Sequence, residues 1–243
     1  MIVRICLSAD GIVKLPKSYN HLLQAFFYRN MDPALSRFLH DIGFVYGKRR
    51  FKLFTFSKVI GRLLGKDKKS GLLFFEPQVS LYFASPLMDI VSSSAKTFLR
   101  RENLFIGKNK LSLESINIVK PQIEEDITVR CLSPITVYRT PIDGGNRFVY
   151  LSPWEEEFYK LLKANLMKKY TLVYGKEYKY NLDIQPVRLS RKHRKKVVYK
   201  GTLIEAWEGY FRLKGNKEML RLALEAGLGA KNSIGFGMIE RVL

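Results

Sequence analysis

The sequence predicts an α+β fold of two tandem ferredoxin-like domains, each with the element order βαββαβ. Each half opens with a β-branched, strand-like run, Met1 to Leu7 in the first and Ile127 to Leu132 in the second. In each half a helical pattern, further strands, a second helical pattern and a last strand follow, which is the order of the split βαβ unit. No residue-level repeat links the halves, so the predicted duplication is one of topology. The domains are expected at residues 1–122 and 123–243, with the boundary near Pro121 to Asp126.

The elements of the first half follow from periodicity and capping signals. Apolar residues recur at helical spacing within residues 19–29. Asp32 is a typical N-cap residue and Pro33 suits the first helical position, so a second helix should run from Pro33 to about Asp41. Strands are expected at 51–56, 71–75 and 78–84, a helix at 86–99, and a hairpin within 104–119.

The second half is marked by turn signals and a long helix. Strands at 135–138 and 148–151 should flank an Asp-Gly-Gly turn at Asp143 to Gly145. Ser152 and Pro153 open a helix that should run to about Tyr170, and acidic residues in its first turn suit the helix dipole. The remaining expected elements are strands within 182–189 and 197–213, a helix at 217–226 capped by Asn216, and a last strand at 235–242.

The charge indicates the kind of partner. Lys and Arg number 42 against 22 Asp and Glu, which gives a formal net charge of +20. Such an excess is expected of a chain that binds a polyanion, and nucleic acid is the leading candidate. A membrane surface is disfavoured because we find no amphipathic basic helix, lipidation signal or long apolar run. Cys6 and Cys131 belong to no C-x-x-C motif, and the N-terminus lacks a signal-peptide pattern, so we expect a reducing, cytoplasmic location.

A glycine-rich segment near the C-terminus is the first candidate site. Glycines let backbone amides approach a phosphate, and successive amides can form an anion-binding nest. Lysine adds charge, while Asn and Ser side chains can bond phosphate or base edges. On spacing alone, a tight turn between a helix and an edge strand fits equally well. The residues expected to contact RNA here are Gly227, Gly229, Lys231, Asn232, Ser233, Gly235 and Gly237.

A dense basic run between residues 188 and 196 is the second candidate site. Like charges so close together repel one another and favour an exposed hairpin tip or loop. On a chain of this net charge, phosphate binding is the favoured interpretation over a merely solvated loop. Its expected RNA-binding residues are Arg191, Lys192, Arg194, Lys195 and Lys196.

Acid–base chemistry has few candidates, because the chain holds three histidines, His21, His40 and His193. His40 should close a helix just before Asp41, where the helix C-terminus favours the imidazolium form. A lone histidine is also a common structural residue. No motif with metal-ligand spacing is present, so we expect neither a metal site nor a cofactor.

Several segments together resemble the CRISPR-associated repeat-processing endoribonucleases of the Cas-six family. Residues 227–237 match the family signature of Gly-hydrophobic-Gly, five residues, and Gly-hydrophobic-Gly. Four further segments resemble sequences of that family: Ala-Phe-Phe-Tyr at 25–28, Phe-Leu-His-Asp at 38–41, Phe-Lys-Leu-Phe-Thr-Phe-Ser at 51–57 and Trp-Glu-Glu-Glu-Phe-Tyr at 154–159.

The resemblance implies a fold of two tandem ferredoxin-like (RRM-like) domains and a metal-independent endoribonuclease that cuts CRISPR precursor RNA within repeats. It places the catalytic residues at Tyr28, His40 and Lys52. Cleavage without metal uses the 2′-hydroxyl of the RNA as nucleophile and leaves a 2′,3′-cyclic phosphate. It needs one proton acceptor, one proton donor and a cation on the non-bridging oxygens. Lys52 suits the cation, whereas the sequence leaves open which of Tyr28 and His40 is the acid and which the base.

Two other functions remain open. One is a non-catalytic RNA-binding subunit of a CRISPR interference complex, against which the presence of all three candidate catalytic residues argues. The other is a general single-strand RNA-binding protein. The expected partner in the favoured case is CRISPR precursor RNA, with other CRISPR-associated proteins as further candidates. The sequence is compatible with a monomer or a homodimer.

Overall fold

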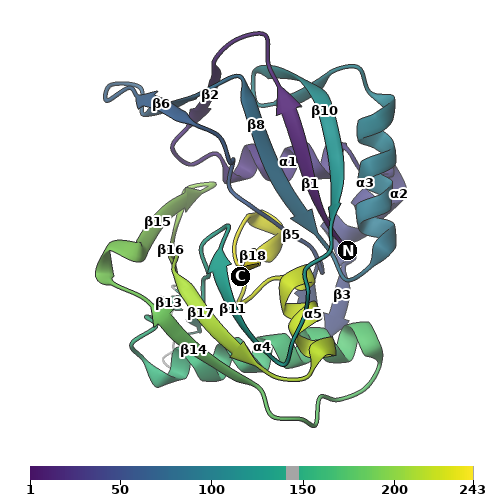
Figure 1. Ribbon diagram of the computed structural model, residues 1–243, viewed down its shortest axis with the longest axis vertical. Helices are drawn as coiled ribbons and strands as arrows, with labels where there is room; N and C mark the ends of the chain where they lie inside the picture. Colours follow the sequence, from purple (N-terminus) through teal and green to yellow (C-terminus); the bar gives the residue numbers. More distant parts are fainter. Residues whose placement is uncertain (141–147, 243) are drawn as a thin grey trace.

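The structure is a computed structural model that describes residues 1–140 and 148–242. The N-terminal half is an antiparallel sheet with the strand order β5-β8-β1-β10-β9 and two long helices on one face (Figure 1). Its elements are β1 (Ile2–Ser8), α1 (Asn20–Arg29), β5 (Thr55–Phe56), β8 (Gln78–Ala84), α3 (Met88–Arg100), β9 (Leu104–Ile106) and β10 (Asn109–Val119).

The C-terminal half repeats this arrangement with the strand order β14-β17-β11-β18. Its elements are β11 (Asp126–Cys131), α4 (Glu156–Tyr174), β14 (Asp183–Arg188), β17 (Tyr210–Lys214), α5 (Lys217–Ala226) and β18 (Ile239–Val242). In both halves the first strand is central and lies between the third and fourth strands of the βαββαβ unit. The predicted α+β fold of two ferredoxin-like domains is therefore confirmed.

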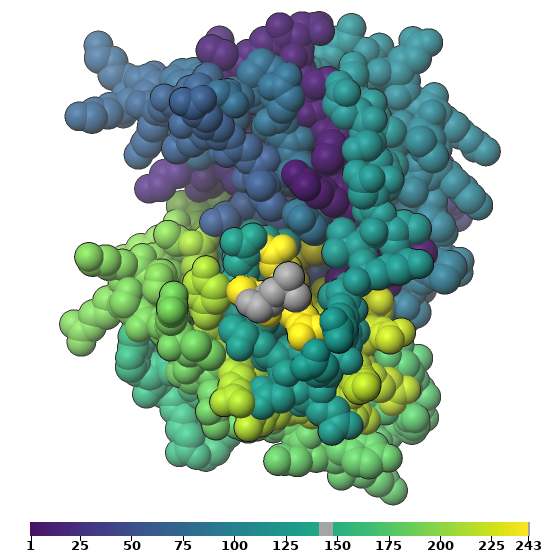
Figure 2. Space-filling view, in the orientation of Figure 1, coloured from purple at the N-terminus to yellow at the C-terminus, as the bar shows by residue number. Residues whose placement is uncertain are grey.

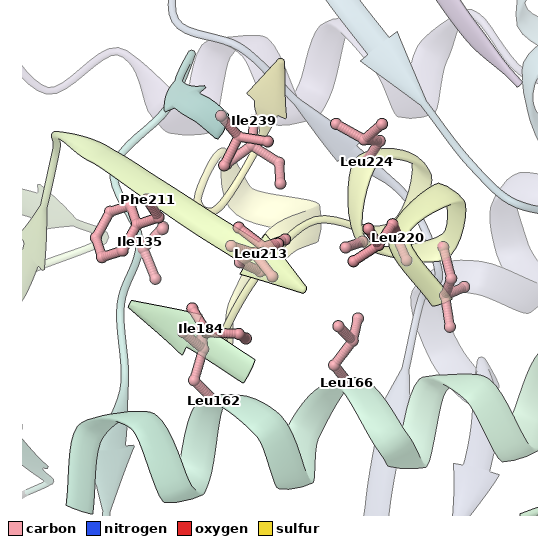
Figure 3. Packing of buried hydrophobic residues seen from close by; sticks show 14 of the residues in the cluster. Ile135, Leu162, Leu166, Ile184, Phe211, Leu213, Leu220, Leu224 and Ile239 are labelled. Atoms are coloured by element: carbon pink, nitrogen blue, oxygen red, sulfur yellow. The ribbon is translucent and has the colours of Figure 1, made fainter. Parts of the chain in front are cut away.

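Each half has its own apolar core because one face of each amphipathic helix packs on a sheet. In the first, the ring of Phe27 on α1 stacks on Phe83 of β8 with centroids 4.5 Å apart. In the second, Leu162 and Leu166 of α4 point toward Leu213 of β17 (Figure 3). Two N-terminal residues, Ile2 and Ala84, belong to the C-terminal core. The halves are thus joined through their apolar interiors.

Short elements complete the fold. The sequence did not predict the strands at residues 13–16, 44–46 and 63–66. The turn predicted at Asp143 to Gly145 lies outside the described residues. The short elements are β2 (Val13–Pro16), α2 (Pro33–Arg37), the π-helical turn η1 (Phe38–Ile42), β3 (Phe44–Tyr46), β4 (Arg49–Phe51), β6 (Leu63–Lys66), β7 (Leu72–Phe75), β12 (Tyr138–Arg139), β13 (Val149–Tyr150), the 3-10 turn η2 (Arg191–His193), β15 (Arg194–Tyr199), β16 (Thr202–Trp207) and the 3-10 turn η3 (Asn232–Ile234).

Two predicted elements near the candidate catalytic residues were wrong in extent. The strand predicted at 51–56 is broken, because Leu53 adopts a positive φ of 53° and its buried side chain joins the core. The helix predicted from Pro33 to Asp41 is α-helical only to Arg37 and then widens into η1. Tertiary packing overrides local preference in both segments.

The long helix of the second half also differs from its prediction. It begins at Glu156 rather than at Ser152, and it continues to Tyr174. Residues 152–155 form a turn instead, in which the Glu155 amide donates to the Ser152 carbonyl at 2.9 Å. This turn leaves Trp154 exposed ahead of the helix.

The two halves pack against each other over a broad contact, with the C-terminal segment between them (Figure 2). The Asn20 side-chain amide donates to the Ile234 carbonyl at 2.9 Å, and the Thr55 hydroxyl donates to the Phe236 carbonyl at 3.2 Å. The glycine-rich segment is thereby fixed to both halves, whereas a division of the chain at residue 122 stays a prediction. No helix among the described residues is long and apolar enough to cross a membrane.

Candidate active site

Tyr28 lies on the last turn of α1, one residue after Phe27 turns inward to the core. Its ring meets His40 edge-on with centroids 5.8 Å apart, and it contacts Phe54 at 5.6 Å. Burial among these rings raises the pKa of the Tyr28 phenol above its ordinary value. The phenol therefore stays protonated near neutral pH, where it can donate a proton or a hydrogen bond.

His40 lies in η1, which directly follows the short helix α2. Asp32 caps the start of α2, as predicted. The carboxylate of Asp32 accepts from the amides of Ala34 and Leu35, both at 3.0 Å. The turn closes with the Gly43 amide on the Phe38 carbonyl at 2.8 Å. Single π-helical turns are frequent at functional sites because they redirect one side chain. Here the turn presents a His40 side chain that is 70% exposed.

The neighbouring carboxylate orients the His40 ring. His40 Nδ1 donates to Asp41 Oδ1 at 2.7 Å. A carboxylate can only accept, so this bond fixes the proton on Nδ1 and leaves Nε2 to exchange a proton with a ligand. Sequence reasoning did not name Asp41 as a site residue, although its position directly after His40 was a visible signal.

Lys52 reaches the same turn from the end of β4. Its Nζ donates to the His40 carbonyl at 2.8 Å, and Arg50 Nη1 donates to the Asp41 carbonyl at 2.9 Å. The approach depends on Gly43, at which φ is +67° and an added Cβ would lie 2.6 Å from the Phe51 carbonyl. Partial burial and the charge of Arg50 lower the pKa of Lys52, while Asp41 opposes this change.

The structure thus brings the three predicted catalytic residues together from α1, η1 and the end of β4. Tyr28 and His40 line one hollow, which also carries the cations Arg29 and Arg37. Lys52 lines a second hollow between the two halves. The hydrogen bond from Lys52 Nζ to the His40 carbonyl links the two hollows.

The glycine-rich loop forms one wall of the second hollow. The amides of Gly227, Gly235 and Gly237 donate to carbonyls of the protein. An added Cβ at Gly237 would lie 1.9 Å from the Leu228 carbonyl, and one at Gly229 would lie 2.5 Å from the Thr136 carbonyl. These glycines therefore serve the close packing of the loop itself.

Two polar residues of the loop make different contacts. The Asn232 amide donates to the carbonyls of Leu228 and Phe236 at 3.1 and 3.0 Å, so this side chain holds the loop together. Lys231 and Ser233 line the hollow with Asn232, and the ammonium of Lys231 lies 4.9 Å from the Tyr138 ring centroid. RNA contact by the loop stays a prediction.

A buried cation that sequence reasoning missed organises this loop. Lys169 of α4 is 2% exposed, and its Nζ donates to the Gly227 carbonyl at 2.7 Å and to the Gly229 carbonyl at 3.1 Å. It also donates to Asn232 Oδ1 at 2.7 Å. Burial lowers the pKa of Lys169 to about 7. A lysine in the middle of a helical pattern gives no sign in sequence that it points inward.

The basic run is more ordered than the exposed loop that the sequence predicted. Its last three residues, Arg194 to Lys196, begin β15, which pairs with β16, and the neighbouring side chains of Arg194 and Lys195 both meet acidic residues. Arg194 bonds both oxygens of Glu205, and Lys195 pairs with Glu208 at 3.3 Å. Arg191, Lys192 and Lys196 are exposed and have no ion pair among the described residues.

Comparison with known proteins decides the family. Residues 14–117 match the family model described as "CRISPR-associated protein Cas6, N-terminal", and residues 118–241 match "CRISPR associated protein Cas6, C-terminal". The chain belongs to the Cas6 family. The resemblance inferred from the sequence segments is therefore confirmed.

Relatives of this Cas6 chain match over nearly its full length. It is 27% identical over 237 residues to the "CRISPR-associated endoribonuclease Cas6" of Pyrococcus furiosus, covering 95% of this chain and 85% of the relative. It is 25% identical to "CRISPR-associated endoribonuclease Cas6 1" of Methanocaldococcus jannaschii, covering 100% and 93%. The solved structure "CRISPR associated protein Cas6" matches with a TM-score of 0.81 at 24% identity, covering 100% of this chain and 99% of that one. That likeness supports the tandem ferredoxin-like fold.

Proposed function

We propose that this Cas6 chain binds CRISPR precursor RNA and cleaves it within repeats as a metal-independent endoribonuclease. The observation that carries the proposal is that Tyr28 lies against the His40 ring, while Lys52 donates to the His40 carbonyl, beside two cation-lined hollows. The three residues supply a protonated phenol, an imidazole with one free nitrogen and an ammonium. These are the groups that phosphodiester cleavage by an internal hydroxyl requires. The names of the relatives from Pyrococcus furiosus and Methanocaldococcus jannaschii support the same activity.

The geometry also suggests how the roles are divided. Because the pKa of Tyr28 is raised, its phenol is a poor base at neutral pH. His40 Nε2 would then take the proton of the 2′-hydroxyl, and the 2′-oxygen would attack the phosphorus. The bond to the 5′-oxygen breaks, Tyr28 donates its proton to that oxygen, and a 2′,3′-cyclic phosphate remains. Lys52 would stabilise the negative charge that builds on the non-bridging oxygens.

The first test removes the nucleophile. A repeat RNA of the host with one 2′-deoxy sugar just 5′ of the cut should bind normally and remain intact, and EDTA should not slow cleavage of the unmodified repeat. His40→Ala should slow cleavage about 10²- to 10⁴-fold at nearly unchanged RNA affinity. His21→Ala, an exposed histidine on the same half, is the matched control. Cleavage of the deoxy repeat at the same bond, or full inhibition by EDTA, would refute the proposal.

The second test assigns the acid. A repeat with sulfur in place of the leaving 5′-oxygen needs no proton at that position, because a thiolate is a good leaving group. Tyr28→Phe should be slow on the ordinary repeat and close to wild type on the sulfur repeat. His40→Ala should be slow on both. If the sulfur repeat restored cleavage only for His40→Ala, His40 would be the acid and Tyr28 the base. If the wild-type protein bound the repeat without cutting it, the chain would be the non-catalytic RNA-binding subunit instead.

A further inference from the structure

Both tryptophans of the chain meet in one pocket on the C-terminal half, away from the candidate catalytic residues. The rings of Trp154 and Trp207 lie edge-to-face with centroids 5.0 Å apart. Trp207 is buried on β16, whereas Trp154 is 56% exposed in the turn before α4. An indole exposed to this extent presents a large flat surface that no residue of the fold covers fully. Both rings line a hollow bounded by β13, β15 and β16.

The rim of this pocket is cationic and its inner wall is polar. Arg191 and Arg194 of the basic run line it. Arg194 is held by Glu205 at 2.5 and 2.6 Å, while Arg191 has no ion pair among the described residues. The Tyr150 hydroxyl is buried at the same pocket and has no hydrogen-bond partner among the described residues. A buried hydroxyl without a hydrogen-bond partner raises the free energy of the folded protein, so binding of a ligand that forms a hydrogen bond with it would be favoured.

We propose that this pocket binds one nucleobase of single-stranded RNA, stacked on the exposed face of Trp154, with the adjoining phosphate at Arg191. The inference rests on the proposed function only in taking RNA as the ligand. An aromatic face beside arginines is the arrangement on which single-stranded nucleic acid binds, since every base has a π-face and every nucleotide a negative charge. The Tyr150 hydroxyl is the group available to the edge of the base.

The pocket is connected to the cleft at Lys52 by the β12–β13 hairpin. Tyr138 of β12 pairs with Tyr150 of β13, and their ring centroids are 5.9 Å apart. Tyr150 lines the tryptophan pocket, and Tyr138 lines the hollow that Lys52 also lines. Lys231 lies over the Tyr138 ring on that side. A single strand that extends from the cleft toward Trp154 would therefore pass the rings of Tyr138 and Tyr150 on these paired strands.

The test uses the chain's own fluorescence. Trp207→Phe leaves Trp154 as the single tryptophan of the protein. Titration with the non-cleavable 2′-deoxy repeat should quench its emission at the same RNA concentration that saturates binding in an electrophoretic assay. Trp154→Ala should lower repeat affinity roughly 10- to 100-fold, and Trp154→Phe should restore most of the loss. Arg191→Glu should also weaken binding. Phe105→Ala, a similarly exposed aromatic on β9, is the matched control and should bind as wild type.

The outcomes separate this inference from the proposed function. Unchanged affinity of Trp154→Ala, together with unquenched Trp154 emission in a protein that still cuts the repeat, would refute the pocket and leave the nuclease intact. Quenching and a Trp154-dependent affinity without cleavage would support the pocket and refute the nuclease. A protein that binds no RNA would refute both. Thermal midpoints of Trp154→Ala and Trp154→Phe should match the wild type, because the side chain is largely exposed.

Discussion

Replacing Lys169 with methionine tests how the glycine-rich loop is held. Methionine keeps most of the length of the side chain but removes the amino group, whose Nζ bonds two loop carbonyls and the Asn232 amide oxygen. Each buried acceptor left without a partner costs about 1–3 kcal/mol. Because methionine also removes the cost of burying a charge, we expect a net loss of about 3–5 kcal/mol in the free energy of unfolding.

The effect should depend on pH in a defined direction. Burial lowers the pKa of Lys169 to about 7, below the roughly 10.4 of an unfolded lysine. Between these values the unfolded chain binds more protons than the folded chain, so the stability that this lysine contributes rises with pH. This contribution to stability is fully present above the pKa of the unfolded lysine, and it is lost as the pH falls to about 7. The advantage of wild type over Lys169→Met should grow by up to about 1.4 kcal/mol per pH unit in this window.

The assay is urea unfolding followed by circular dichroism at pH 7 and pH 9, with repeat affinity measured in parallel. Lys160→Met, an exposed lysine on the same helix, is the matched control and should unfold as wild type. An equal free energy of unfolding for Lys169→Met and wild type would refute the role assigned to the Lys169 amino group. A difference that stays constant from pH 7 to pH 9 would refute the lowered pKa.

The remaining predictions concern the two surfaces expected to contact RNA. Neutralising Arg191, Lys192 and Lys196 should weaken binding of single-stranded RNA, measured by titration at several salt concentrations. A plot of the logarithm of the binding constant against the logarithm of the salt concentration should become shallower, its slope changing by about 0.7 for each phosphate that the variant no longer neutralises. An unchanged slope would mean that these side chains touch no phosphate. Gly229→Val should lower the thermal midpoint and the repeat affinity together, because its Cβ would meet the Thr136 carbonyl at 2.5 Å where φ is +69°. A wild-type midpoint with weakened binding would instead indicate direct contact between Gly229 and RNA.

The fold was largely predictable because its elements carry local signals. The helix at Lys217–Ala226 has both the periodicity and the Asn216 cap that the sequence indicates, and Asn216 accepts from the Met219 amide as a cap should. The strand Gln78–Ala84 is similarly visible from its alternation. Such signals depend on residues close in sequence, so a single chain reveals them.

The residues of the candidate site were predicted from resemblance and stay a prediction, whereas the backbone features and contacts that hold them were not predicted. Tyr28, His40 and Lys52 were found through resemblance, whereas the π-helical turn and the positive φ at Leu53 follow from packing between distant segments. The inward direction of Lys169 depends on the final fold in the same way. Side-chain direction on a helix is set by which face meets the core, and a lysine on that face looks like any other lysine in sequence.

The position of the C-terminal segment between the halves has a consequence for how the protein meets its ligand. Asn20 and Thr55 hold this segment from one side, and the core residues Ile2 and Ala84 reach across from the same half. A hinge motion between the halves would break these hydrogen bonds and expose apolar surface. We therefore expect the two halves to unfold in one cooperative transition, and fragments cut between them to fold only when mixed. Under the proposed function we expect the halves to keep their arrangement on binding, so RNA strands that are already extended should associate fastest.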